Sequence, residues 1–336
     1  MRILFMGTPD FAVPCLQALV ENQYNVIGVV TQPDRPKGRK QVLTPPPVKI
    51  AAEALGIPVY QPEKVSAREH VEFFQTLSID LVITAAFGQL LSKEFLAIPR
   101  LGCINVHASL LPKYRGGAPI HWSVINGETE TGVTIMYMEE KLDAGDILSQ
   151  KQVDIEFTDT TGIVYEKVTQ AGAQLLIETL PDLIGGKLTP VKQNQAMATF
   201  AYNIRRQDEA IDWNKDAFAI YNQIRGLSPW PGAYTTVHGQ ILKVLSSEIY
   251  DACEQMEIGT ADVQTEKAQT GIQDAQAGEI VGFTRKGPVI LTGNGQIVLT
   301  QVQPAGKKMI SGADYVNSGK IRIGDLLAAE EMNGGQ

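Results

Sequence analysis

Cysteine is scarce in this chain of 336 residues. Its three cysteines, Cys15, Cys103 and Cys253, lie far apart and form no CxxC pair. This spacing argues against a disulfide framework and against a cysteine-based zinc site, and it is typical of proteins from a reducing compartment. Because Cys103 lies within an apolar run, we expect it to be a small core residue rather than a nucleophile.

Long hydrophobic runs are also lacking. No stretch approaches the ~18 apolar residues that a membrane-spanning helix needs. The apolar run at the N-terminus, MRILFMGTPDF, is too short for a signal peptide. We therefore expect a cytoplasmic protein without a membrane partner.

Positive charge is not in excess. The chain carries 29 Lys and Arg against 37 Asp and Glu, which gives a formal net charge of -8. This balance excludes a globally basic nucleic-acid binder, so any nucleic-acid surface must be a local patch. A hydrophobic fraction of 44% at this length is enough to build a core of useful size.

Short apolar runs alternate with helical patterns through the first half of the chain. Strand patterns are expected at residues 2–6, 25–32, 57–62, 79–87, 103–110 and 131–138, and a long helix at 162–186. The alternation predicts an α/β domain over residues 1–186 with a Rossmann-like, doubly wound, mostly parallel sheet. The first turn holds one glycine, Gly7, where a dinucleotide fingerprint needs three, which argues against NAD as a cofactor.

The pattern changes after residue 186. Residues 187–207 are polar with weak periodicity, and we expect a linker there. Residues 208–336 contain about five short strand patterns, separated by turn signals such as Lys286-Gly287 and Asn294-Gly295. They predict a small all-β, OB-like barrel. Within it, residues 251–277 are acidic and rich in Gln, Ala and Thr, and we expect a mobile insertion.

The strand pattern CINVHASL carries two polar residues in an apolar run. Alternation along a strand places Asn105 and His107 on one face, and both side chains can donate a hydrogen bond to a developing negative oxygen. The next strand pattern leads to Asp143, whose carboxylate would fix the tautomer of His107. Without a serine or cysteine nucleophile, the set indicates direct acyl-type transfer between two substrates. The same residues also fit a structural histidine and a solvated acidic loop.

The sequence around these residues resembles that of the folate-dependent formyltransferases. Residues 109–116, SLLPKYRG, match that family's signature S-L-L-P-x-[YWF]-R-G. The resemblance implies that Asn105, His107 and Asp143 are catalytic, that 10-formyltetrahydrofolate is the co-substrate, and that no metal takes part. It also implies a folate site along the carboxyl edge of the sheet, formed by residues from SLLP and from AAFGQLL: Ser109, Leu110, Leu111, Pro112, Phe87, Gly88 and Leu90.

Three further features resemble the members of this family that formylate methionyl-initiator tRNA for translation initiation. The start of the chain implies that Phe11 helps to form a pocket for the methionyl side chain. The basic, proline-rich segment after residue 32 and the β-rich tail imply contacts with tRNA. The cations concerned are Arg35, Lys37, Arg39 and Lys40 in the segment, and Lys243, Lys307 and Lys308 in the tail, where Arg285 and Lys286 are further candidates. The resemblance also suggests a monomer.

Two rival functions stay open at this point. One is a formyltransferase that acts on another amine, of a nucleotide sugar or a glycinamide, although such an enzyme should lack the basic segment. The other is an RNA-binding protein without activity, which should have lost one of the three catalytic residues. The chain departs from the family pattern at Lys141 and Ala144, where many members have Gly and Thr, but Asp143 between them is kept.

Overall fold

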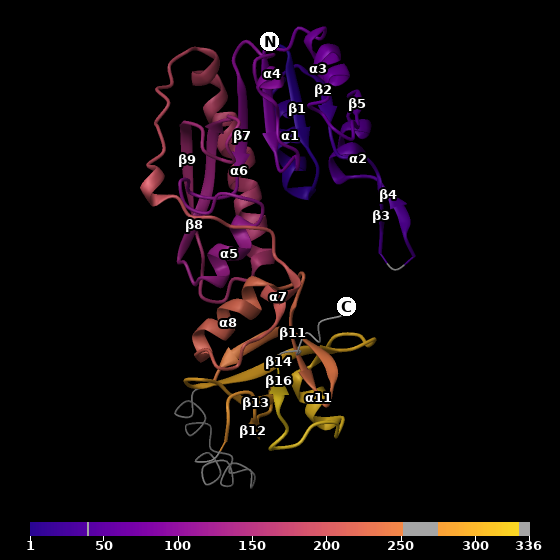
Figure 1. Cartoon of the computed structure of the whole chain (residues 1–336), viewed down its shortest axis with the longest axis vertical. Coiled ribbons are helices and arrows are strands. Elements are labelled where there is room, and N and C mark those ends of the chain that lie inside the picture. The colour runs from indigo at the N-terminus through magenta and orange to yellow at the C-terminus, as the bar shows by residue number, and fades with distance from the viewer. Residues whose placement is uncertain (39, 251–274, 329–336) are drawn as a thin grey trace. The chain divides into compact units, whose positions relative to one another are not determined.

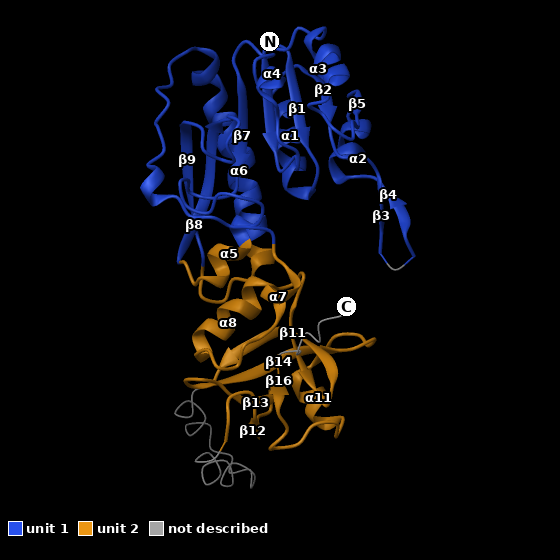
Figure 2. Cartoon of the chain, viewed as in Figure 1, with its two compact units in different colours: residues 1–120, 129–155, 164–203 blue, residues 121–128, 156–163, 204–336 orange. Residues whose placement is uncertain are grey.

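The computed structural model describes residues 1–38, 40–250 and 275–328, and these form two compact units. Unit 1 comprises residues 1–120, 129–155 and 164–203, and unit 2 comprises residues 121–128, 156–163 and those from 204 onward (Figure 2). Arg39, Cys253 and nearly all of the predicted insertion at 251–277 lie outside the described residues. The predicted domain boundaries at 186 and 207 stay predictions.

Unit 1 is built on a seven-stranded sheet in the order β5-β2-β1-β6-β7-β8-β9 (Figure 1). Neighbouring strands from β5 to β7 are parallel, and β8 and β9 are antiparallel. The Rossmann-like, mostly parallel sheet is therefore confirmed. The strands are β1 (Ile3–Gly7), β2 (Val26–Val30), β5 (Val59–Tyr60), β6 (Leu81–Ala85), β7 (Cys103–His107), β8 (Glu130–Tyr137) and β9 (Ile147–Asp154).

Helices cover both faces of this sheet, since every residue of β1 is buried. Leu4 on β1 packs in one apolar cluster with Phe74 of α3 and Phe95 of α4. The long helix α6 packs on the opposite face of the sheet from Leu4. Its Gly172 lies so close to Val106 that a Cβ added to this glycine would be 3.2 Å from the Val106 side chain. The helices up to residue 203 are α1 (Val13–Glu21), α2 (Pro47–Ala54), α3 (Arg68–Gln75), α4 (Lys93–Leu96), α5 (Pro119–Ile125) and α6 (Thr161–Ile184), with short 3-10 turns at Asp10–Ala12 and Gln195–Met197. Most of α5 and the first turn of α6 belong to unit 2.

The basic, proline-rich segment forms a hairpin outside the main sheet. Its strands, β3 (Arg35–Lys37) and β4 (Val42–Thr44), pair only with each other among the described residues. Proline cannot donate to a ladder, so Pro36 is tolerated in such a two-stranded ribbon and would not be in a central strand. The hairpin is anchored at its base, where the ammonium group of Lys49 on α2 donates to both carboxylate oxygens of Asp34 at 2.8 and 3.0 Å.

Unit 2 contains an antiparallel sheet in the order β12-β13-β14-β11-β10-β16, with β15 paired to β14. Backbone bonds from Leu327 to Gly278 (2.8 Å) and from Ile280 to Asp325 (2.9 Å) link the two ends, so the sheet curls into a small barrel. The predicted OB-like fold is thus confirmed. The strands are β10 (Ala233–Val237), β11 (Gln240–Ile249), β12 (Ile280–Phe283), β13 (Pro288–Leu291), β14 (Gln296–Pro304), β15 (Ile310–Ser311) and β16 (Leu327–Ala328), and the helices are α7 (Arg206–Glu209), α8 (Ala217–Gly226) and α11 (Gly312–Asn317).

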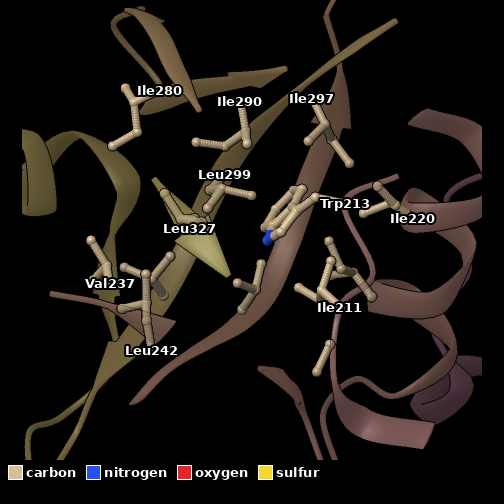
Figure 3. Packing of buried hydrophobic residues seen from close by; sticks show 14 of the residues in the cluster. Ile211, Trp213, Ile220, Val237, Leu242, Ile280, Ile290, Ile297, Leu299 and Leu327 are labelled. Atoms are coloured by element: carbon tan, nitrogen blue, oxygen red, sulfur yellow. The ribbon is translucent and has the colours of Figure 1, made fainter. Parts of the chain in front are cut away.

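The core of unit 2 gathers around Trp213 (Figure 3). Its indole ring lies among aliphatic side chains from the barrel strands and from α8, including Leu299 and Ile220. The indole N–H donates to the hydroxyl of Thr235 at 3.0 Å, and that hydroxyl donates to the carbonyl of Ala328. A buried polar atom is therefore satisfied inside an apolar core.

The two described cysteines are core residues. Cys15 and Cys103 are 0% and 2% exposed, and burial raises the pKa of each thiol to about 12. The prediction that Cys103 is a core residue is confirmed. Among the described residues, no helix has the length and apolar character that crossing a membrane requires.

Candidate active site

The end of β7 presents Asn105 with a fixed orientation. Alternation places Cys103, Asn105 and His107 on one face of the sheet, opposite Val106. The hydroxyl of Thr84 on β6 donates to the Oδ1 atom of Asn105 at 2.8 Å. Because this bond occupies the carbonyl end of the amide, the N–H₂ end of Asn105 is left to donate elsewhere.

His107 is held at both ring nitrogens. Its side chain is 6% exposed, Nε2 lies 3.1 Å from the carbonyl oxygen of Tyr114, and Nδ1 lies 3.7 Å from the Oδ2 atom of Asp143. A backbone carbonyl can only accept, so Nε2 carries the hydrogen. Nδ1, the nitrogen beside Asp143, is therefore the one that can take up or release a proton.

Asp143 lies near His107 as expected, and it comes there by a loop that folds back. β8 is antiparallel to β7 and pairs Ile104 with Tyr137, so β8 ends at the edge of the sheet opposite His107. The loop therefore folds back toward His107. Asp143 adopts a left-handed conformation with φ of 48°, and its Oδ2 atom accepts from the backbone N–H of Gly116 at 2.8 Å.

Gln193 ties this loop down and was missed by the sequence analysis. Its Nε2 atom donates to the carbonyls of Asp143 (2.9 Å) and Gly145 (2.7 Å), and its Oε1 atom accepts twice from the guanidinium of Arg115, at 3.1 and 2.6 Å. Gln193 and Arg115 are 7% and 4% exposed. The polar sequence around Gln193 has weak periodicity and predicted a linker. No local sequence pattern therefore marked this residue as part of a site.

The SLLP loop is held rigidly on the sheet. The hydroxyl of Thr134 on β8 donates to the carbonyl of Ser109 at 2.7 Å and accepts from the backbone N–H of Leu111 at 3.1 Å. Gln150 on β9 donates to both the carbonyl of Leu111 and the Thr134 hydroxyl, each at 2.9 Å. The hydroxyl of Ser109 closes the loop by donating to the carbonyl of Lys113. Such a preorganised loop loses little entropy when it binds a flat ligand.

The second predicted folate segment follows β6. Phe87 is buried, and its carbonyl accepts from the hydroxyl of Thr8 (2.9 Å) and from the side-chain amide of Gln32 (3.1 Å). Gly88 has a φ of 87°, a conformation that side chains disfavour. Leu90 is 69% exposed, so this short segment presents an apolar side chain outward from a tethered backbone.

Phe11 lies just before α1. Its side chain is 4% exposed and meets the ring of Tyr165 edge-on, with centroids 6.0 Å apart. The backbone N–H of Phe11 donates to the Tyr165 hydroxyl at 2.8 Å. Phe11 is thus fixed in place within unit 1.

The predicted tRNA-binding cations divide between the two units. In unit 1, Arg35, Lys37 and Lys40 are exposed, and Arg35 forms an ion pair with Glu63. In unit 2, the exposed Lys307 and Lys308 follow β14, whereas Lys243 is half-buried and donates to the carbonyl of Pro231. The ammonium group of Lys286 pairs with Glu248. Each unit therefore carries its own small group of cations.

The described residues contain no cluster of three or more His, Cys, Asp or Glu side chains that could hold a metal ion. The site at the end of β7 consists of one amide, one imidazole and one carboxylate, together with the backbone and amide groups that hold them. This set can supply hydrogen-bond donors to an oxyanion and a group for proton transfer.

Comparison with known proteins identifies the family to which the chain belongs. Residues 1–180 match the Formyl transferase family, and residues 203–320 match its C-terminal domain. The chain belongs to the formyl transferase family. It is 52% identical over 327 residues to the methionyl-tRNA formyltransferase of Bacillus subtilis strain 168, with 97% of each chain covered. A methionyl-tRNA formyltransferase from Bacillus velezensis is also 52% identical, over 334 residues and 99% of each chain.

Solved structures share the fold at lower identity. HypX from Aquifex aeolicus, solved in complex with tetrahydrofolic acid, matches with a TM-score of 0.61 and 16% identity, over 95% of this chain and 47% of that one. An N-formyltransferase from Helicobacter canadensis, in complex with folinic acid and dTDP-3-aminofucose, matches with a TM-score of 0.59 and 19% identity, over 90% and 98%. At these identities the likeness extends to the fold alone.

Proposed function

We propose that this protein transfers the formyl group of 10-formyltetrahydrofolate to the α-amino group of methionyl-initiator tRNA, giving N-formylmethionyl-tRNA. One observation carries the chemistry: His107 is held between the Tyr114 carbonyl and the Asp143 carboxylate, on the same strand face as Asn105. The acceptor is inferred from the relatives that match the chain over nearly its full length, which are methionyl-tRNA formyltransferases.

The amine of the methionyl group attacks the formyl carbon and forms a C–N bond, and the formyl oxygen becomes an oxyanion. The N–H₂ group of Asn105, oriented by Thr84, donates to that oxyanion. A protonated His107 donates from Nδ1, because Nε2 already donates to Tyr114. The bond from the formyl carbon to N10 of the folate then breaks. The proton lost by the amine ends on N10, so formylmethionyl-tRNA and tetrahydrofolate leave.

Asp143 acts as the partner of His107 in this scheme. Its carboxylate lies 3.7 Å from Nδ1, which is close enough for charge attraction but leaves room for a small adjustment or a bridging water. The backbone N–H of Gly116 and the amide of Gln193 hold the loop that carries Asp143. We propose that Asp143 orients the imidazolium and assists the transfer of the proton from the amine to N10.

Two segments along the same edge of the sheet are suited to bind the co-substrate. The SLLP loop is cross-linked by the hydroxyl of Thr134 and the amide of Gln150, so it offers a firm wall to a flat pteridine ring. The tethered backbone at Phe87 and Gly88 offers a second wall, with Leu90 as an apolar contact. We propose that these two segments hold the folate.

The polynucleotide part of the acceptor requires cations. The hairpin carries exposed Arg35, Lys37 and Lys40, which can meet the phosphates of the acceptor stem. Lys307 and Lys308 on the barrel provide a second contact area.

We propose that the protein works as a monomer in the cytoplasm, where methionyl-tRNA is made and used. We also propose that Phe11 contributes to the pocket for the methionyl side chain.

A formylation assay tests this function. Purified protein is mixed with 10-formyltetrahydrofolate and one of three acceptors: methionyl-initiator tRNA, methionyl-elongator tRNA, or a nucleotide-linked amino sugar. We expect N-formylmethionine on the initiator tRNA, far less on the elongator, and no formylated sugar. Formylation of the sugar without formylation of the initiator tRNA would assign the chain to the alternative acceptor class.

A further inference from the structure

Two aromatic side chains lie exposed beside the candidate active site. Phe200 and Tyr202 are 52% and 61% exposed, although large apolar side chains in this unit are mostly buried. Their rings are stacked almost in parallel, with centroids 5.9 Å apart and an angle of 7° between the planes. The pair therefore forms an exposed stack of two nearly parallel rings, which we call the 200/202 stack.

The 200/202 stack is attached to the loop that contacts His107. The backbone N–H of Ala201 donates to the carbonyl of Arg115 at 2.7 Å, and that of Arg115 donates to the carbonyl of Thr199 at 2.9 Å. The hydroxyl of Thr199 accepts from the backbone N–H of Tyr114, whose own carbonyl meets Nε2 of His107. Tyr114 thus connects the contact with His107 directly to the segment that carries the stack.

Alternation along this segment fixes which side faces outward. Ala201 is fully buried. A Cβ added to Gly116 would lie only 2.6 Å from the carbonyl oxygen of Ala201, so the two backbones are in close contact. Phe200 and Tyr202 on either side of Ala201 must therefore point to the other face. Because Ala201 is held against Gly116 and Arg115 of the loop at residues 109–116, the backbone keeps both rings on the outward face.

We propose that the 200/202 stack is a platform for an unpaired nucleobase at the 3′ end of the acceptor tRNA. This inference rests on the proposed function, because the methionyl ester must reach Asn105 and His107, and the 3′-terminal nucleotide is covalently attached to it. Bases of single-stranded RNA stack readily on aromatic rings, whatever their identity. Lys113 in the same loop is exposed and adds a positive charge for the neighbouring phosphate. The platform would hold the 3′ end while the amine reacts.

Kinetic measurements on Phe200→Ala, Tyr202→Ala and the double variant test the role of the platform. We expect the double variant to raise the KM for methionyl-tRNA by about ten-fold or more, with the KM for 10-formyltetrahydrofolate unchanged and kcat at saturating tRNA within about two-fold of wild type. Phe200→Trp and Tyr202→Phe keep a ring at each position and should stay near wild type. Met197→Ala is the matched control, because Met197 is 56% exposed on the same segment but lies outside the stack.

A binding measurement separates this inference from the proposed function. The 3′-terminal adenine of the tRNA is replaced by 2-aminopurine, whose fluorescence falls on stacking, and the protein is titrated without a formyl donor. We expect quenching with wild type and Met197→Ala, and little quenching at saturation with the double variant. Equal quenching in all proteins, or a rise in the folate KM instead of the tRNA KM, would overturn the platform. Absence of formyl transfer by wild type would instead overturn the proposed function while leaving the quenching result readable.

Discussion

The side-chain amide of Gln193 donates to the backbone carbonyl of Asp143 at 2.9 Å, so a residue 50 positions away in the sequence determines where the candidate catalytic carboxylate lies. The same side chain accepts two hydrogen bonds from the buried guanidinium of Arg115. One glutamine thus joins the SLLPKYRG loop to the loop that brings Asp143 to His107. The geometry of the site depends on both connections.

Gln193→Ala should damage both stability and activity. The change removes the partner of two carbonyls and of the Nε and Nη2 groups of the buried Arg115 guanidinium, and an unsatisfied group typically costs about 1–3 kcal/mol. We expect a lower unfolding midpoint in urea and a fall in kcat of about ten-fold or more, because Asp143 loses its fixed position. Gln195→Ala is the control: Gln195 meets only the outer Nη1 of Arg115 and is exposed, so both effects should be small. Equal effects of the two variants would contradict the role given to Gln193.

The hairpin cations should govern the salt dependence of tRNA use. Removing Lys37 or Arg35 should lower kcat/KM for methionyl-tRNA and reduce the slope of its logarithm against the logarithm of salt concentration by about one per lost phosphate contact. Glu63→Gln should act in the opposite direction at low salt, since it removes the carboxylate that pairs with Arg35. The measurement is a series of kcat/KM values between low and physiological salt. Slopes that do not change in the lysine and arginine variants would remove the hairpin from the interface.

Asp34 should make the stability of unit 1 depend on pH. A hydrogen bond from Gln61, followed by one from Lys49, holds the pKa of the Asp34 carboxyl below its ordinary value. The unfolded chain therefore binds this proton more readily, so the stabilisation is complete above the ordinary pKa of about 3.9 and is lost as the pH falls through the lower folded value. The advantage of wild type over Asp34→Asn in urea unfolding should be present at neutral pH and shrink as the pH falls below that range. An advantage of wild type that stays constant as the pH falls through this range would contradict the role given to Asp34.

Much of the fold could be predicted because its signals are local. The short apolar runs of β1, β2 and β6 and the helical spacing of α1 and α6 are strong patterns. The turn signals at Lys286-Gly287 and Asn294-Gly295 fall between consecutive barrel strands, as expected. β9 was missed. It is a polar edge strand whose exposed and half-buried residues alternate, so it lacks the apolar run that marks a central strand.

The site was only partly predictable for a different reason. Asn105 and His107 share a strand, so alternation alone places them together. Asp143 comes near His107 although β8 runs antiparallel to β7, and this depends on a left-handed residue and on the distant tether of Gln193. The aromatic stack of Phe200 and Tyr202 is likewise visible only once Ala201 is seen packed against Gly116. Long-range contacts of this kind have no signature in a single sequence.

The most direct test of the central claim is the rate of formyl transfer by Asn105→Ala. With its Oδ1 atom held by Thr84, Asn105 is proposed to donate to the oxyanion from its N–H₂ group, and loss of one such donor typically lowers the rate by about 10²–10³-fold. We predict a fall of that size in kcat for methionyl-initiator tRNA, with tRNA binding nearly intact and a smaller fall for Thr84→Val. A kcat close to that of wild type in Asn105→Ala would contradict the account.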